Sequence, residues 1–194
     1  MAVPPDMTVM NISGKYTMNK ALSTNTDEIL QLQGVGWFKR KIISAGTLYL
    51  NIKHYVDDAS IEHIDIEQSL SGLATTNEDR ILDWQQRSHE DDVFGIVISK
   101  TKRVPLKEIK NDWLRGGWTE DTASFDIVYT DADSDAEKNG IVWNAVQTWG
   151  FEYINGEKRH VRHVSFTGSK GEKVQSRLVY DYSELFEAMV VVQS

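Results

Sequence analysis

The stretch that decides the fold is NISGKYTMNKALSTNTDEILQLQGVGWFKRKIISAGTLYLNIKHY, residues 11–55. It begins with an extended segment over Ile12–Leu22 and ends with a strand over Thr47–Val56, whose apolar side chains alternate with polar ones. Between them the spacing predicts two short helices within residues 27–45, separated at Gly34 because glycine adopts the left-handed stop without steric cost. The stretch therefore predicts a helix-turn-helix lid between the first two strands of a β protein.

The rest of the chain is dominated by short strands with turn residues between them. Alternating or continuous apolar runs predict strands over Ser60–Leu70, Arg80–Ser88, Val93–Ser99, Ile141–Tyr153, Arg159–Phe166 and Lys173–Tyr182. Asn155-Gly156 is the strongest hairpin signal. We expect a mainly β protein, with residues 1–194 forming one antiparallel up-and-down barrel of about ten strands.

Two segments depart from the β pattern. After Pro105, the residues Leu106, Ile109, Trp113 and Leu114 follow helical spacing until Gly116-Gly117, which predicts an amphipathic helical insertion over 105–117. Residues 183–194 form an apolar C-terminal extension with the composition of a short helix.

The opening stretch resembles the intracellular fatty-acid-binding proteins, which are lipocalin-like members of the calycin superfamily. In that family a G-x-W/Y strand precedes L-x-x-L-G-V-G-x-x-x-R-K. The matching residues here are Gly14, Tyr16, Gly34, Val35, Gly36, Arg40 and Lys41. The hairpin at 151–158 and the strand at 177–180 are similar to the family's C-terminal end. The resemblance implies a barrel that encloses a small hydrophobic organic molecule.

The chain departs from the family at the carboxylate clamp. The family's inward Arg, four residues before the hairpin Asn/Asp-Gly, corresponds to Phe151. Its R-x-Y pair is spaced as Arg177-Leu-Val-Tyr180, which places the two side chains on opposite faces unless a bulge intervenes. Because a buried carboxylate without a guanidinium partner is unfavourable, we expect an aromatic or polycyclic, mostly neutral ligand instead of a simple fatty acid.

Composition excludes several function classes. The chain has no Cys and a formal net charge of −8, which argues against thiol chemistry and against nucleic-acid partners. The first residues carry no secretory signal, and no apolar run approaches the roughly 20 residues of a membrane span. We expect a cytoplasmic protein without membrane insertion, and the oligomeric state is not indicated.

No motif indicates a cofactor or a metal. G-x-S-x-G, P-loop, dinucleotide and H-E-x-x-H patterns are absent from the sequence. The spacing of Asp131, Asp133 and Asp135 matches the first three ligands of an EF-hand loop. However, Ala136 stands at the position that requires glycine, and Val142 stands at the position of the bidentate Glu. Residues 131–140 are therefore predicted to be a hairpin loop, and we expect neither a metal nor a cofactor.

The candidate catalytic residues are hydrogen-bond donors. His54 shares its strand face with Leu48, Leu50 and Ile52, so it is either a satisfied core residue or a group that polarises a ligand. Arg177 and Tyr180 are candidates for the same role, and Gln68 and Asn144 are the next candidates.

An aromatic face supplies the candidate ligand-binding residues. Trp143, Trp149, Phe151 and Tyr153 share one parity on the Ile141–Tyr153 strand, which fits either a packed core or a cavity wall. The other expected ligand contacts are Tyr16, Trp37 and Trp84.

Three functions remain open. The first is a cofactor-independent cyclase, a pericyclase of the Diels–Alderase type or an isomerase, which folds one natural-product intermediate inside the barrel. The second is a carrier of fatty-acid-like or other hydrophobic metabolites, and the third is a structural protein with a filled barrel. The two additional segments favour the enzyme, since excluding water and fixing one conformer benefit a catalyst more than a carrier.

Overall fold

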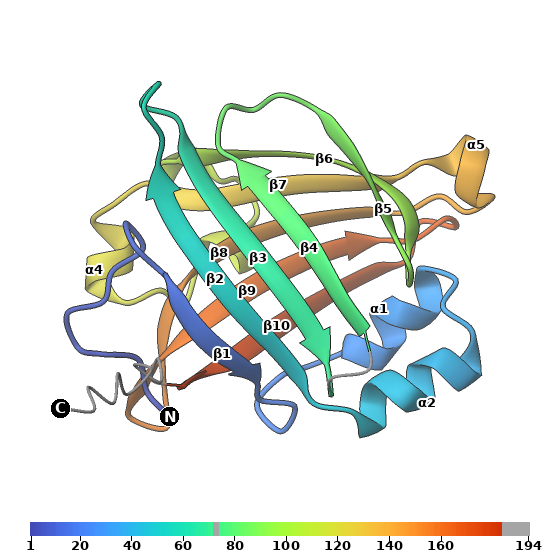
Figure 1. Cartoon of the computed structure of the whole chain (residues 1–194), viewed down its shortest axis with the longest axis horizontal. Helices are drawn as coiled ribbons and strands as arrows, with labels where there is room; N and C mark the ends of the chain where they lie inside the picture. Colours follow the sequence, from blue (N-terminus) through green and yellow to red (C-terminus); the bar gives the residue numbers. More distant parts are fainter. Residues whose placement is uncertain (72–73, 184–194) are drawn as a thin grey trace, which may run out of the picture.

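Ten antiparallel strands form a single curled sheet in a computed structural model that describes residues 1–71 and 74–183. The sheet order is β4-β3-β2-β1-β10-β9-β8-β7-β6-β5, so β1 pairs with β10 and the ladder stays open only between β4 and β5. The strands are β1 Gly14–Met18, β2 Leu48–Val56, β3 Glu62–Leu70, β4 Ala74–Ile81, β5 Arg87–Asp91, β6 Gly95–Val104, β7 Ile127–Ser134, β8 Asn144–Ile154, β9 Glu157–Thr167 and β10 Lys173–Ser183. Strands β1 to β4 cross the front of the barrel and β8 to β10 its back (Figure 1). The predicted ten-stranded antiparallel barrel is confirmed.

The predicted strand over Arg80–Ser88 is wrong. The chain leaves β4 after Ile81 and enters β5 only at Arg87. Between them Trp84 has φ 61°, and its N–H donates to the carbonyl of Thr101. The strand β4 (ATTNEDRI) is so polar that its sequence shows no alternation of apolar and polar residues. The apolar residues that do alternate, Leu82 and Trp84, lie in the bend after it.

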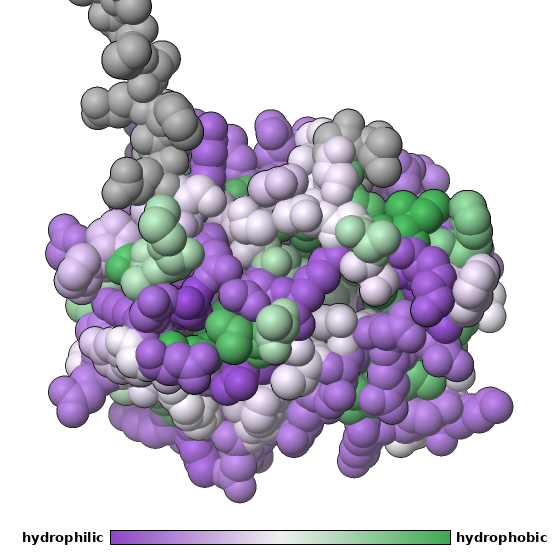
Figure 2. Space-filling model, turned by 90° about the horizontal axis from the view of Figure 1, so that it is seen from below, coloured by the Kyte–Doolittle hydropathy of each residue, from purple (hydrophilic) through white to green (hydrophobic). Residues whose placement is uncertain are grey.

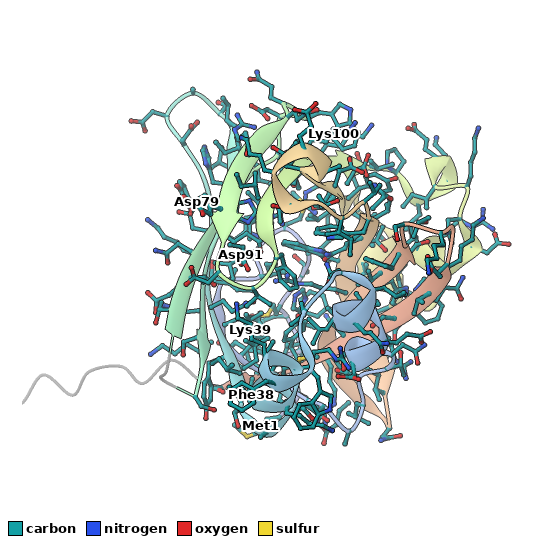
Figure 3. All side chains as sticks on the ribbon, turned by 90° about the vertical axis from the view of Figure 1, so that its right-hand side faces the viewer. Met1, Phe38, Lys39, Asp79, Asp91 and Lys100 are labelled. Atoms are coloured by element: carbon teal, nitrogen blue, oxygen red, sulfur yellow. The ribbon has the colours of Figure 1, made fainter. Side chains whose placement is uncertain are left out.

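The helical lid is confirmed and covers one end of the barrel. It consists of α1 Thr26–Leu32 and α2 Trp37–Ala45, with Gly34 at φ +84° between them. Ile29 and Leu32 of α1 pack against buried barrel residues. Figure 3 looks onto this end, with Lys39 of α2 below Asp91 of β5; the Lys39 ammonium donates to the Asp92 carbonyl at 2.8 Å.

Residues 1–13 close the opposite end, a role that the sequence did not indicate. Val3, Val9 and Ile12 are buried against the same cluster as Tyr16 and Phe151. This end is therefore filled by the protein's own apolar side chains, whereas α1 and α2 cover the other.

The insertion at 105–117 is not the single helix that its spacing predicted. It forms a 3-10 turn at Leu106–Glu108 and a short α3 at Asp112–Arg115, followed by α4 at Glu120–Ala123. The turn ends at Ile109, and Asn111 caps α3, since its side chain accepts from two backbone N–H groups. The segment lies on the outer wall, where Trp113 stacks on His163 at a centroid distance of 4.5 Å and the tilted ring of Trp118 lies 4.3 Å from it.

The aspartate-rich segment is only partly a loop. Asp131 and Asp133 lie within β7, and a short α5 at Ala136–Asn139 follows. Within residues 1–71 and 74–183, no group of three or more His, Asp or Glu side chains is arranged to hold a metal ion. Of the predicted C-terminal extension over 183–194, Ser183 is the last residue of β10, and residues 184–194 lie outside the described part of the chain.

The surface seen from below is mainly hydrophilic, with apolar patches between polar ones (Figure 2). None of the helices in the described ranges is long and apolar enough to cross a membrane.

Candidate functional site in the barrel interior

The interior is built by register across β8, β9 and β10. Trp149 of β8 lies opposite Arg162 of β9, and Arg162 lies opposite Leu178 of β10. One step along the barrel, Phe151, His160 and Tyr180 are paired in the same way. Directly paired residues share a face of the sheet. Trp149, Phe151 and Tyr180 pack in one core cluster with residues of β1, β2 and β3 from the opposite wall, so the row points into the barrel. The predicted inward parity of Trp149 and Phe151 is confirmed.

Arg162 is a buried cation on an aromatic wall. Its guanidinium lies 3.9 Å from the ring centroid of Trp149 and 5.3 Å from that of Tyr180, and the residue is 6% exposed. Burial lowers the pKa of Arg162, while Tyr180 and Tyr16 oppose that effect. Within the described residues its Nε and Nη2 have no hydrogen-bond partner. The side chain therefore offers free donors inside the barrel.

Arg80 reaches the same interior from β4. It is also 6% exposed, pairs with Glu78 and donates to the Ser99 hydroxyl at 2.8 Å. Its Nε has no partner in the described part of the chain. Burial first, and then the charge of Arg162, lowers the pKa of Arg80 to about 9. Because guanidinium groups keep their proton in proteins, the two positive charges repel each other.

A neutral aromatic group surrounds Arg162. The His160 ring lies 5.3 Å from Tyr16 and 5.4 Å from Tyr180, between centroids. Burial, followed by the charge of Arg162, lowers the pKa of His160 to about 3, against the opposing contact with the Gly150 carbonyl. Burial is also the main cause that raises the pKa of Tyr16 and Tyr180. Both phenols and the imidazole are therefore uncharged at neutral pH.

His54 faces the interior, but both of its ring nitrogens are engaged. Its Nδ1 accepts from the Ile12 N–H at 3.1 Å, so its Nε2 carries the proton and donates to Glu62 at 2.6 Å. Arg103 also binds Glu62 and donates to the Val9 carbonyl at 2.7 Å. Although burial raises the pKa of Glu62, the bonds from His54 and Arg103 bring it to about 2. The network fastens residues 9–12 over the barrel end, which favours the structural alternative for His54.

The lid side of the interior is more apolar. Buried residues of β6 to β10 pack there with α1, and the cluster comprises Val97, Ala132, Trp143, Ala145, Val164, Phe166 and Val174, with Ile29 and Leu32 at its edge. Trp143 stacks on Phe166 at 6.1 Å between centroids. Its indole Nε1 is buried and has no hydrogen-bond partner within the described ranges. This region combines an apolar wall with one free donor.

Several expected site residues lie away from the interior. Arg177 is on the outer face, where it binds Glu152, and Asn144 is on the outer face, where its amide donates to Asp131 and Asp133. Gln68 does face inward from β3, half-buried. The opposite orientation of Arg177 and Tyr180 follows strand alternation, without a bulge.

Three of the expected aromatic contacts are also outside. Trp37 is 64% exposed on α2, and Tyr153 is 68% exposed near the end of β8. Trp84 sits on the outer wall, with Lys100 and Lys102 each 4.5 Å from its ring centroid. Strand parity and aromatic character had suggested that these three residues line the cavity. The bend at 82–86 instead turns Trp84 outward, Tyr153 lies near the end of its strand, and the orientation of α2 exposes Trp37.

Neither interior arginine was among the candidate residues, and Arg177, the guanidinium that was, lies on the outer face. A usable signal existed for Arg162, because it shares strand parity with His160, Val164 and Phe166. No comparable signal existed for Arg80, since β4 was not recognised as a strand.

Relatives with similar sequences span almost the whole chain. A probable pericyclase, scpY, from Mollisia scopiformis is 28% identical over 185 residues, covering 93% of this chain and 94% of that protein. The pericyclase pydY from an Acremonium species is 28% identical over 188 residues, covering 94% and 97%. No protein-family model matches the chain.

Solved structures with a similar fold include two lipid-binding proteins and a fluorescent protein. Lipid binding protein 8 of Caenorhabditis elegans is 14% identical, with a TM-score of 0.55 over 88% of this chain and 94% of that one. The Schistosoma mansoni fatty acid binding protein in complex with arachidonic acid is 12% identical, with a TM-score of 0.55 over 89% and 96%. The fluorescent protein UnaG is 16% identical, with a TM-score of 0.51 over 89% and 97%. The calycin-like, fatty-acid-binding-protein-like fold is confirmed.

Proposed function

We propose that this protein is a cofactor-independent pericyclase that closes a ring within one largely apolar organic substrate held inside the barrel. Two pericyclase relatives matched over nearly the full chain support this proposal. The observation that carries it in the structure is the guanidinium of Arg162, buried on an aromatic wall with free N–H groups. The fold alone would fit a carrier equally well.

A pericyclic ring closure needs no chemical participation by protein side chains. Its π electrons move in one cyclic array, so that new σ bonds form as π bonds are lost, and no atom, proton or electron is exchanged with the protein. No nucleophile is therefore required. The barrier falls when the reacting ends are held in one conformer and when a donor withdraws electron density through an attached carbonyl group.

Arg162 is the residue placed to be that donor. Its free Nε and Nη2 can bond a carbonyl oxygen of the substrate, while Trp149 fixes the plane of the guanidinium. Such a donor acts strongly in the interior because little water competes with it. Tyr180, stacked on His160 beside Arg162, supplies an uncharged wall.

The two ends of the barrel suggest how the substrate lies. The end closed by residues 1–13 is packed with Val9, Ile12 and Phe151. The apolar hydrocarbon would therefore extend from Arg162 toward the lid-side wall of Trp143 and Phe166. Exclusion of water by α1 and α2 would keep the chain folded on itself during ring closure.

The test follows the conversion of a linear polyene that carries a conjugated carbonyl group. Purified protein should raise the rate of ring closure and narrow the product to one stereoisomer, relative to buffer. Arg162→Gln should lower turnover by roughly 10- to 1,000-fold. The control is Arg115→Gln, an outer-wall arginine that pairs with Asp112 and should leave turnover unchanged.

A carrier is the alternative that the same experiment addresses. A solved structure with this fold holds arachidonic acid according to its name, and an interior arginine suits such a ligand. If the polyene binds but its rate and product ratio match those in buffer, the protein is a carrier and not a pericyclase.

A further inference from the structure

Two buried arginines face the barrel interior from strands that are far apart in the sheet. Arg80 projects from β4 and Arg162 from β9, with β3, β2, β1 and β10 between these strands. Both residues are 6% exposed. Nitrogen atoms of both lack hydrogen-bond partners in the described ranges, namely Nε of Arg80 and Nε and Nη2 of Arg162. The free donors therefore come from two sides of one interior.

The charge around these donors is not balanced. Glu78 pairs with Arg80, whereas Arg162 pairs with no carboxylate among residues 1–71 and 74–183. The groups that contact Arg162 are aromatic rings, and the neighbouring His160 is neutral. Glu62 is already bound to Arg103 and His54. One positive charge thus remains uncompensated in the interior.

We propose that the polar end of the substrate is a delocalised oxygen anion, a carboxylate or the enolate of a 1,3-dicarbonyl group, bound between Arg162 and Arg80. The inference rests on the proposed function, because it assigns the chemical class of the substrate for that same interior site. It also replaces the mostly neutral ligand that the sequence predicted.

An anion fits this site better than a neutral carbonyl group for two reasons. A buried cation without a partner is strongly unfavourable, and only an anion removes that penalty. In addition, two guanidiniums that repel each other both gain from one anion, and their planar N–H edges match a pair of oxygen atoms. The reaction that supplies the substrate must then leave an ionised acid group on it before ring closure.

Matched probes test the charge directly. The anionic probes are 2-decanoylcyclohexane-1,3-dione, ionised near neutral pH, and decanoate. Their neutral counterparts are the enol O-methyl ether of the dione and methyl decanoate. Isothermal titration calorimetry should give at least one anion that binds wild-type protein roughly 30-fold or more tightly than its neutral counterpart. Comparing this ratio of affinities for the dione pair and for the decanoate pair shows which anion the site prefers.

Variants locate the effect. In Arg162→Gln, the anion should bind no more than about threefold more tightly than its neutral counterpart. Arg80→Gln should lower this ratio of affinities by a smaller factor, because Glu78 already compensates the charge of Arg80. Arg162→Lys keeps the charge and should retain part of the ratio. Arg115→Gln should leave it as in wild type. Unchanged affinity for the two neutral probes shows that each variant is folded.

The inference is overturned if wild-type protein binds each anion no better than its neutral counterpart, or if Arg162→Gln keeps the full ratio. These results differ from a failure of the proposed function. Ring closure of a neutral polyene without anion preference would refute only the anion site, whereas anion preference without acceleration of any polyene would refute only the pericyclase.

Discussion

The guanidinium of Arg162 lies 3.9 Å from the ring centroid of Trp149 inside the barrel. The two residues face each other because β8 and β9 pair in direct register after the tight turn at Asn155-Gly156. Stacking on an aromatic face contributes about 0.5–2 kcal/mol, which is less than the several kcal/mol that burial of a charge costs. The contact therefore orients the guanidinium, but it does not offset the free-energy cost of burying the charge on folding.

Replacing this cation with an apolar side chain should stabilise the empty protein. Arg162→Met keeps a flexible side chain against Trp149 and removes the buried charge, so we expect the free energy of unfolding to rise by about 1–3 kcal/mol and turnover to fall. Thermal and urea unfolding measure the first effect. A loss of stability would show that the cation is compensated within the fold.

Stability should decrease in acid through Glu62. Its pKa of about 2 in the folded protein lies below its ordinary value of 4.5, so its bonds to His54 and Arg103 contribute fully above pH 4.5. The contribution, about 3 kcal/mol, is lost as the pH falls from 4.5 through 2. Urea unfolding of wild-type protein and Glu62→Gln should converge over this range. Parallel curves would contradict the assignment.

His54 should behave as a structural residue. His54→Ala removes the acceptor of the Ile12 N–H and a donor to Glu62, and we expect destabilisation by about 2–4 kcal/mol. Hydrogen exchange should increase first in residues 1–13. A drop in turnover of more than about 100-fold with unchanged stability and exchange would instead favour a catalytic role.

Gly117 should tolerate no side chain. A Cβ there would lie 2.4 Å from Glu152 Oε1, and its φ is +85°. Gly117→Ala should destabilise the protein by about 1–3 kcal/mol and loosen the insertion from the outer wall. Gly140→Ala is the matched control, because Gly140 has φ +69° with nothing within 4 Å. Equal losses in the two variants would show that only backbone strain matters.

The free indole N–H of Trp143 should matter for ligands and not for folding. Trp143→Phe keeps an aromatic ring against Phe166 and removes a buried donor that has no partner among the described residues. We expect stability within about 0.5 kcal/mol of wild type and affinity roughly 5- to 20-fold lower for substrates with an oxygen near the lid. Equal affinity for substrates with and without that oxygen would exclude the contact.

Local features of the sequence determined the order of the elements. The glycines at 34 and 36 and the alternation after Thr47 were sufficient for the lid and β2, and Asn155-Gly156 for the last hairpin. Parity on one strand also gave the inward direction of Trp149 and Phe151. These features depend on a few neighbouring residues, which is why sequence alone reveals them.

The tertiary structure decided which charged groups meet inside. Arg80 and Arg162 are 82 positions apart in the printed sequence, and only closure of the sheet brings β4 and β9 to face each other. Tertiary contacts also engaged His54 with residues 9–12. The bend at 82–86 placed Trp84 on the outer wall, and strand alternation placed Arg177 there. Alternation tells which side chains share a face of one strand, but it carries no information about what lies across the barrel. That depends on register and closure, which are set by contacts distant in sequence.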